Sequence, residues 1–258
     1  MEDTWGPLTV PSPGVLPDPG ACHLWVARTA GAASNLALLD QDEHEAAGRF
    51  RLESAKDAFV ASRAAQRLVI GRYLGRPPEA MKIARDCRHC GKQHGRPYVP
   101  DAPVDFSVSH SAGWLLLAVV SAGVVGVDLE QVSNRSVDDL ANRVLGPAEQ
   151  QQFLLVPRDE RAGWFIRLWA RKEAALKLTG HGIAGPLARL NVTGPVAVVS
   201  APPAGWPAEP IHLRDVEAAA HDVRAAVATT VALTEVIPCG PALGIAGNAG
   251  RPPDISPA

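Results

Sequence analysis

The sequence is poor in the residues and patterns that mark several specialised classes of protein. Four cysteines in 258 residues are too few for a disulfide scaffold. The formal net charge of −2 provides no basic excess to neutralise phosphates, so no nucleic-acid partner is expected. The longest apolar run, residues 114–127, is interrupted by one serine and two glycines and is too short to cross a membrane.

The N-terminal segment has no pattern of a signal peptide. It is acidic and proline-rich, and no basic start is followed by an apolar core. Hydrophobic residues make up 47% of the chain and charged residues 20%, as in ordinary globular proteins. The composition therefore predicts a cytoplasmic globular protein with no membrane partner.

Strand-like and helix-like segments follow one another in irregular order, which predicts an α+β fold. Residues 40–73 are periodic and charged and are expected to form one or two helices, whereas residues 86–103 are expected to be mostly loop. The clearest helix covers residues 164–179 and is ended by Gly180. Shorter helices are expected at residues 137–145 and 147–155, strands at 22–28, 104–109, 114–120, 124–130, 197–200 and 225–236, and inward-facing side chains at Phe50, Ala58, Phe59, Leu68 and Val69.

Two carboxylates stand out in the segment VVGVDLE. Asp128 and Glu130 alternate with apolar residues, and on a strand this period of two places both acids on one face. A solvated polar face is the simpler explanation of such a pair. The regular alternation and a second acidic segment downstream favour a metal site.

The second segment, WARKEAALK, repeats functional side chains every four residues. Trp169, Glu173 and Lys177 form one stripe on a helix, and Phe165 precedes them by a further turn. A surface ion pair would explain Glu173 and Lys177 but not the aromatic residues, so the charged end of the stripe is expected to border a cleft. Three carboxylates with an ammonium group beside them suit a hard cation such as Mg²⁺ that carries phosphate oxygens.

Several single residues have both a structural and a functional interpretation. His110, with Ser109 beside it, ends a candidate strand and either bonds a turn or donates to a phosphate. Arg63 and Arg96 are either solvated surface residues or anion contacts. Arg96 lies between Gly95 and Pro97 in a stiff turn, which suits a preorganised contact with an anion.

The segment CRHCGKQHG contains Cys87, Cys90, His89 and His94, which resemble half of a zinc site. A structural zinc site normally takes four ligands from two such turns, and only one turn is present. A pair of reduced loop cysteines is the alternative interpretation.

The segments FSVSHS, VGVDLE and FIRLWARKEAALKLTGHGI, in this order and spacing, resemble the surfactin-type 4′-phosphopantetheinyl transferases. The resemblance runs from about Leu39 to Ile183. It implies a pseudo-dimer of two similar α/β halves with the active site in the cleft between them. It also implies a Mg²⁺-dependent enzyme that moves the phosphopantetheine arm of coenzyme A to a serine of an apo acyl or peptidyl carrier protein, releasing adenosine 3′,5′-bisphosphate.

The resemblance also implies roles for individual residues. Asp128, Glu130 and Glu173 would bind the metal, with Glu173 the base for the serine and Lys177 stabilising the leaving group. Some relatives carry lysines for the nucleotide 3′-phosphate before the position of Phe50, where this chain has Glu43 and Ala46, so Arg49 or Arg63 is expected to substitute. The residues expected to hold the phosphates of coenzyme A are Lys177, Lys172, His110, Ser109, Arg96 and Arg63.

The resemblance leads to a division of the chain into an extended lead-in at residues 1–20, an N-terminal half at 21–123, a C-terminal half with the metal-binding and catalytic motifs at 124–237, and a disordered tail at 238–258. Two halves in one chain predict a monomer. The alternatives are another Mg²⁺-dependent enzyme acting on a nucleotide pyrophosphate and a non-enzymatic binding module organised by zinc.

Overall fold

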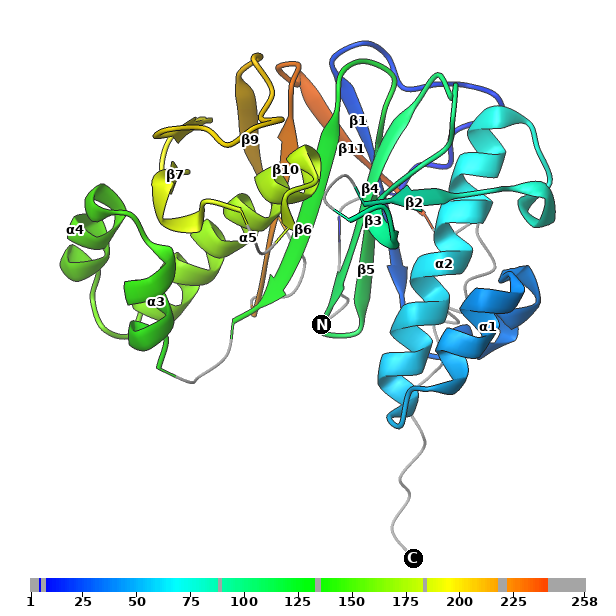
Figure 1. The fold of residues 1–258 in the computed structure, drawn as a ribbon, viewed down its shortest axis with the longest axis horizontal. Helices are drawn as coiled ribbons and strands as arrows, with labels where there is room; N and C mark the ends of the chain where they lie inside the picture. Colours follow the sequence, from blue (N-terminus) through cyan, green and yellow to red (C-terminus); the bar gives the residue numbers. More distant parts are fainter. Residues whose placement is uncertain are drawn as a thin grey trace, which may run out of the picture.

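The computed structural model describes residues 5, 8–87, 90–132, 136–182, 185–217 and 222–240. Two larger sheets with helices on their outer sides, together with a small two-stranded sheet, make up the described fold, which confirms the predicted α+β class (Figure 1). The strand order is β11-β1-β5-β4 in the first sheet and β6-β10-β9-β8-β7 in the second. No helix in the described part of the chain is both long and apolar enough to span a membrane.

The first sheet contains strands from near both ends of the described part of the chain. Strand β1 (Ala21–Arg28) pairs in parallel with β11 (Glu235–Cys239) and antiparallel with β5 (Trp114–Val120). Strand β4 (Asp105–Ser111) forms a hairpin with β5. The outer helices are α1 (Gln41–Gly48) and α2 (Glu53–Leu74), so the predicted helical segment 40–73 divides into two. Two short 3-10 helices, η1 (Ala32–Leu38) and η2 (Pro78–Ala80), flank them.

The second sheet is antiparallel and carries helix α5 (Arg161–Thr179) along β6 (Val125–Gln131) and β10 (Val223–Thr229). Gly180 ends α5 in the left-handed conformation, φ 74°, as its position after the helix predicts. The remaining elements are α3 (Asp138–Val144), α4 (Pro147–Leu155), η4 (Leu187–Arg189), β7 (Leu190–Asn191), β8 (Val196–Val199) and β9 (Ile211–Val216).

The apolar side chains form three cores, one under α2, one under α5 and one shared by the two sheets. Alternation along the strands produces this division, since neighbouring residues of a strand point to opposite faces. Leu115 and Leu117 of β5 pack in the first core, while Leu116 packs in the shared core with Val127 of β6. The sheets also approach at β4 and β6, where Ser107 Oγ accepts a hydrogen bond of 3.1 Å from Val127 N.

Helix α5 lies unusually close to β6 because residue 126 is a glycine. A Cβ at Gly126 would lie 1.9 Å from Ala174 O and 2.7 Å from Leu178 N, both of which are backbone atoms of α5. The missing side chain lets the helix backbone rest on the strand. This contact positions the polar face of α5 against the two acids that follow Gly126 on β6.

Gly126→Ala is expected to destabilise the fold by about 3 kcal/mol, because neither backbone can move without separating α5 from β6. Urea unfolding measures the loss. The matched control is Gly163→Ala in α5, whose added Cβ meets only the end of the Arg224 side chain at 3.2 Å. That substitution should be neutral or stabilising by up to about 1 kcal/mol. Equal stabilities of the two variants would contradict this account of the contact.

The structure corrects several predictions. Residues 86–103 are rich in loop as predicted, but they also contain an unpredicted hairpin in which β2 (Ala84–Asp86) pairs with β3 (Gln93–Tyr98). Strand β9 was not predicted, since its sequence IHLRDV alternates weakly. Phe50 is 41% exposed, and its ring lies tilted against that of Phe59 with 5.3 Å between the ring centres, so it does not face the core. Pro238 and Cys239 belong to β11 in the first sheet, and therefore not to a disordered tail; residues 241–258 lie outside the described residues.

Candidate active site

Side chains from β4, β6 and α5 meet at the seam between the two sheets. Lys177 Nζ donates to Asp128 Oδ1 at 2.7 Å and to Ser109 Oγ at 2.8 Å. Ser109 Oγ donates in turn to Asp128 Oδ1 at 2.9 Å. The acidic face of β6 and the charged stripe of α5, each predicted from its own periodicity, therefore lie against each other.

The aromatic member of the stripe contacts the second acid. Trp169 Nε1 donates to Glu130 Oε1 at 3.0 Å, so the ring orients that carboxylate. Glu173 lies one helical turn from both Trp169 and Lys177 on α5. Burial, followed by the negative charge of Asp128, raises the pKa of both Glu130 and Glu173. The structure thus gathers three carboxylates, of which two are destabilised in the ionised form.

Two carboxylate oxygens of this group are buried and lack a hydrogen-bond partner within the described structure: Asp128 Oδ2 and Glu173 Oε1. A buried acceptor without a partner destabilises the folded protein unless a cation or a hydrogen-bond donor binds it. In addition to burial, the negative charges of Asp128 and Glu130 raise the pKa of Glu173, as expected of carboxylates that repel one another without a cation. All-oxygen ligands from a few carboxylates fit Mg²⁺, which usually keeps water and substrate oxygens in its shell.

Glu173→Gln is expected to raise the Tm of chelator-treated protein at neutral pH. Because the folded-state pKa of Glu173 is raised above its ordinary value of 4.5, the folded protein holds that proton more tightly than the unfolded chain. The favourable contribution of Glu173 to the free energy of unfolding is present below pH 4.5. It is lost as the pH rises through the raised pKa of Glu173. The Tm advantage of the variant should therefore be largest at neutral pH and vanish in acid.

The measurement is thermal unfolding of both proteins across that pH range, with Glu209→Gln as a control at an exposed position outside the site. The control should follow the wild-type protein throughout. A lower Tm of Glu173→Gln at neutral pH would show that its carboxylate is stabilised rather than repelled by its neighbours.

Positive charge collects on the other side of Ser109. His110 is exposed at the end of β4, and its pKa is lowered by partial burial, then by the charge of Lys177 and by that of Arg63. Arg63 comes from α2, and its guanidinium lies 4.9 Å from the ring centre of Phe59. Its buried Nε lies 3.5 Å from Glu43 Oε1 without a hydrogen bond. Lys177, His110 and Arg63 thus provide donors next to the acidic group, as a phosphate-containing ligand requires.

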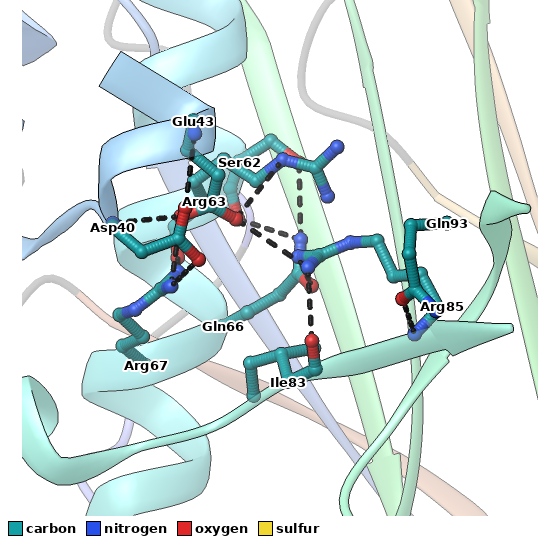
Figure 2. A network of polar contacts seen from close by, with 9 residues as sticks. All are labelled: Asp40, Glu43, Ser62, Arg63, Gln66, Arg67, Ile83, Arg85 and Gln93. Atoms are coloured by element: carbon teal, nitrogen blue, oxygen red, sulfur yellow. Dashed lines mark hydrogen bonds and ion pairs between the residues drawn. The ribbon is translucent and has the colours of Figure 1, made fainter. Parts of the chain in front are cut away.

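A buried network of charged side chains surrounds Glu43 beside Arg63 (Figure 2). Glu43 is 8% exposed and lies 2.7 Å from an Arg67 nitrogen and 3.4 Å from an Arg85 nitrogen. Arg67 also bonds Asp40 at 3.1 Å. Burial, followed by the charge of Arg63, lowers the pKa of Arg85 to about 10. The network holds three guanidinium groups against two carboxylates and therefore keeps a positive excess beside the site.

Sequence reasoning missed Arg67 and Arg85. Arg67 follows Arg63 by one helical turn, so its spacing could have identified it. Arg85 enters from β2, where its N–H groups bond Gln66 Oε1 at 2.8 Å and Ile83 O at 3.2 Å. No local pattern predicts that meeting. Arg49, the other proposed substitute, is an exposed residue whose guanidinium lies 4.0 Å from Glu45.

Lys172 does not lie with the phosphate-binding candidates, which corrects its predicted role. Its side chain is fully buried, and Nζ lies 2.7 Å from Glu149 Oε2 and 2.7 Å from Leu187 O, with a further bond to Leu190 O. Lys172 is one residue, or about 100° of helical rotation, from Glu173, so it faces a different packing surface. Its ammonium group has no access to a ligand at the seam.

Arg96 also has a structural role in place of the predicted anion contact. It pairs with Asp105 through two nitrogens and donates to Val125 O at 2.8 Å and to Phe106 O at 3.3 Å. Asp105 Oδ2 accepts from Val125 N at 2.7 Å. Arg96 therefore ties β3 and β4 to the start of β6, and its two terminal nitrogens are committed to protein acceptors.

A cavity bounded by described residues does not coincide with the acidic group. It has a volume of about 1000 Å³ and lies at the start of α5 and the end of β6, near Trp164 and Val132. The acids lie farther along the same two elements. The cavity wall is rich in arginine: Arg158, Arg161, Arg167 and Arg224.

Comparison with known proteins agrees with the motifs. The model of the 4′-phosphopantetheinyl transferase superfamily matches residues 124–222, which include β6 and α5. The chain is 33% identical over 193 residues to the 4′-phosphopantetheinyl transferase HetI of Nostoc sp., covering 71% of this chain and 78% of HetI. It is 32% identical over 118 residues to the 4′-phosphopantetheinyl transferase Sfp of Bacillus subtilis, covering 44% of this chain and 52% of Sfp. A phosphopantetheinyl transferase of Thraustochytrium sp. is 27% identical over 197 residues, covering 68% of this chain and 66% of that protein. The chain belongs to the 4′-phosphopantetheinyl transferase superfamily.

Proposed function

We propose that this protein transfers the 4′-phosphopantetheine group of coenzyme A to a serine of an apo acyl or peptidyl carrier protein. The observation that carries the proposal is the pair of buried, partnerless carboxylate oxygens on Asp128 and Glu173, held beside Lys177 and Ser109. This combination offers a place for one divalent cation next to donors for a pyrophosphate. Membership of the superfamily supplies the reaction class.

We assign Asp128, Glu130 and Glu173 as the ligands of Mg²⁺, which would neutralise developing charge on the phosphates when bound. Asp128 Oδ2 and Glu173 Oε1 are the oxygens that the protein leaves for it. Glu130 is held in place by Trp169. Lys177 bonds the other oxygen of Asp128 and so fixes which carboxylate edge faces the cation.

The reaction forms a bond between the serine oxygen and the β-phosphorus of coenzyme A and breaks the bond from that phosphorus to the bridging oxygen. Adenosine 3′,5′-bisphosphate leaves with the bridging oxygen. Glu173 accepts the serine proton, directly or through one water. Because a carboxylate that also binds the cation is a weak base at neutral pH, positioning of the serine would carry much of the rate. Lys177 and His110 donate to the phosphate oxygens and stabilise the leaving group.

Arg63 extends the phosphate-binding side of the site in this proposal. The arginine network around Glu43 maintains its positive surroundings. Because Lys172 and Arg96 are committed elsewhere, the remaining phosphate-binding residues are Ser109, His110, Lys177 and Arg63. The two halves of one chain complete the site, so a monomer suffices, and the buried thiols of Cys22 and Cys239 suit a reducing cytoplasm.

The test is incubation of the protein with coenzyme A, Mg²⁺ and a panel of apo carrier proteins from polyketide, non-ribosomal peptide and fatty-acid systems. Intact mass of each carrier should increase by one phosphopantetheine group, and a chelator should prevent the increase. Consumption of coenzyme A without any carrier would indicate a pyrophosphate hydrolase instead. No mass increase on any carrier, with coenzyme A left intact, would contradict the proposal.

A further inference from the structure

The turn between β2 and β3 gathers two cysteines and a histidine that the candidate active site does not use. One ligand atom each from Cys87, Cys90 and His94 lies within 4.8 Å of the others, and Cys90 Sγ is 3.0 Å from His94 Nε2. Thiolate and imidazole are the ligands that zinc prefers, whereas Mg²⁺ takes oxygen. We propose that these three residues bind one zinc ion, at a site separate from the acidic group.

The separations match a single tetrahedral ion. With Zn–S of about 2.3 Å and Zn–N of about 2.0–2.1 Å, two tetrahedral ligands lie roughly 3.6–3.8 Å apart. Separations of 3.0 Å to 4.8 Å require only small side-chain rotations to reach those values. Cys90 and His94 are exposed, so the ion has a direct path from solvent, and water completes the fourth position. His89, a further ligand candidate in the sequence, lies outside the described residues.

The backbone of the turn is shaped to bring these ligands together. Gly91 adopts a φ of +69° and donates to Cys87 O at 2.8 Å, which closes a tight turn around Cys90. Cys87 N donates to Lys92 O at 2.8 Å. A Cβ at Gly95 would lie 2.9 Å from Cys87 Cα, so only glycine allows this approach of the two strands. The approach places His94, the neighbour of Gly95, next to Cys87.

The hairpin that carries the site is held by contacts between its own two strands, such as the hydrogen bond of 2.8 Å from the Tyr98 hydroxyl to Asp86 Oδ2. It is a separate two-stranded sheet, its β2 strand has three residues, and the register shifts between Ala84 and Asp86. A two-stranded hairpin is marginally stable alone. Its strands nevertheless carry two arginines that contact the rest of the fold. Arg85 of β2 belongs to the network around Glu43, and Arg96 of β3 donates a hydrogen bond to the start of β6. Zinc at the tip would hold both strands in the register that positions these arginines.

Zinc binding converts the two thiols to thiolates and releases their protons to solvent. No electron transfer is involved, and the ion takes no part in the proposed transfer reaction. The zinc content can therefore be measured independently of activity, so failure of one proposal does not imply failure of the other.

The experiment loads the full-length reduced protein with zinc, desalts it and measures metal by mass spectrometry. About one zinc per chain is expected. Cys90→Ser and His94→Ala, both at exposed positions, should retain only a small fraction of it. Lys92→Ala in the same turn and Asp128→Ala in the acidic group should retain the full amount.

A second measurement uses Co²⁺ in place of zinc and does not depend on variants that fold poorly. The wild-type protein should show thiolate-to-cobalt charge-transfer absorption, because both proposed thiolates bind the ion. Absence of this absorption in the wild-type protein would overturn the proposal. So would zinc retained by both ligand variants, or a Cys87–Cys90 disulfide in protein prepared under reducing conditions.

Discussion

Asp128→Asn is expected to lower the rate of transfer to a carrier protein by about 10²–10³-fold while leaving the fold intact. Asp128 uses one oxygen to hold Lys177 and Ser109 and leaves the other, buried and partnerless, for the cation. Asparagine keeps an acceptor for Lys177 but removes the charge that would bind Mg²⁺. The measurement is the initial rate of carrier modification by intact mass at several Mg²⁺ concentrations.

A control variant and a Mg²⁺ titration test whether the lower rate comes from the metal site. The isosteric variant Asp139→Asn, at an exposed position on α3, should keep the wild-type rate. Excess Mg²⁺ should partly restore Asp128→Asn, because one ligand of the cation is weakened. Glu173→Gln should not recover, because it also removes the proposed base. A rate for Asp128→Asn within about threefold of wild type would remove the proposed metal site.

Lys172→Met is expected to destabilise the protein by about 3–5 kcal/mol, since it leaves the carboxylate of Glu149 buried without its cation. Glu149 is 1% exposed and also accepts hydrogen bonds from Gly146 N at 2.9 Å and Val192 N at 3.0 Å. The pair therefore joins α5 to α4 and to the segment after β7. Urea unfolding measures the effect.

The double variant Glu149→Gln/Lys172→Met tests the cause. Glutamine can still accept from the backbone, and no unpaired charge remains, so a large part of the lost stability should return. At a temperature where Lys172→Met remains folded, its KM for coenzyme A should equal that of wild type. A raised KM with unchanged stability would restore Lys172 to the phosphate-binding residues.

The acidic strand and the charged helix were predictable because periodicity alone assigns their faces. Asp128 and Glu130 share one face of any strand over residues 125–131, and Trp169, Glu173 and Lys177 share one stripe of any helix over 161–179. The irregular order of these elements also predicted the α+β class. Their roles at the metal remain predictions from the family resemblance.

Sequence spacing did not separate Lys172 from its neighbour Glu173, or reveal that Arg96 pairs with Asp105. Both basic residues are used inside this fold for packing and alignment of elements. A charged side chain in a motif can point to a ligand or to a buried partner. Which of the two the side chain contacts depends on the surface that packs against it, and sequence spacing does not determine that surface.

The amino-acid sequence by itself determined the acidic strand, the charged helix, the faces that carry acids and bases, and the family, since these depend on local periodicity and residue type. Only the tertiary structure decided that the faces meet, because that requires α5 to rest on the bare backbone of Gly126. It also decided that three arginines surround Glu43 and that Cys87, Cys90 and His94 converge. Long-range packing sets these distances, and no local pattern records them.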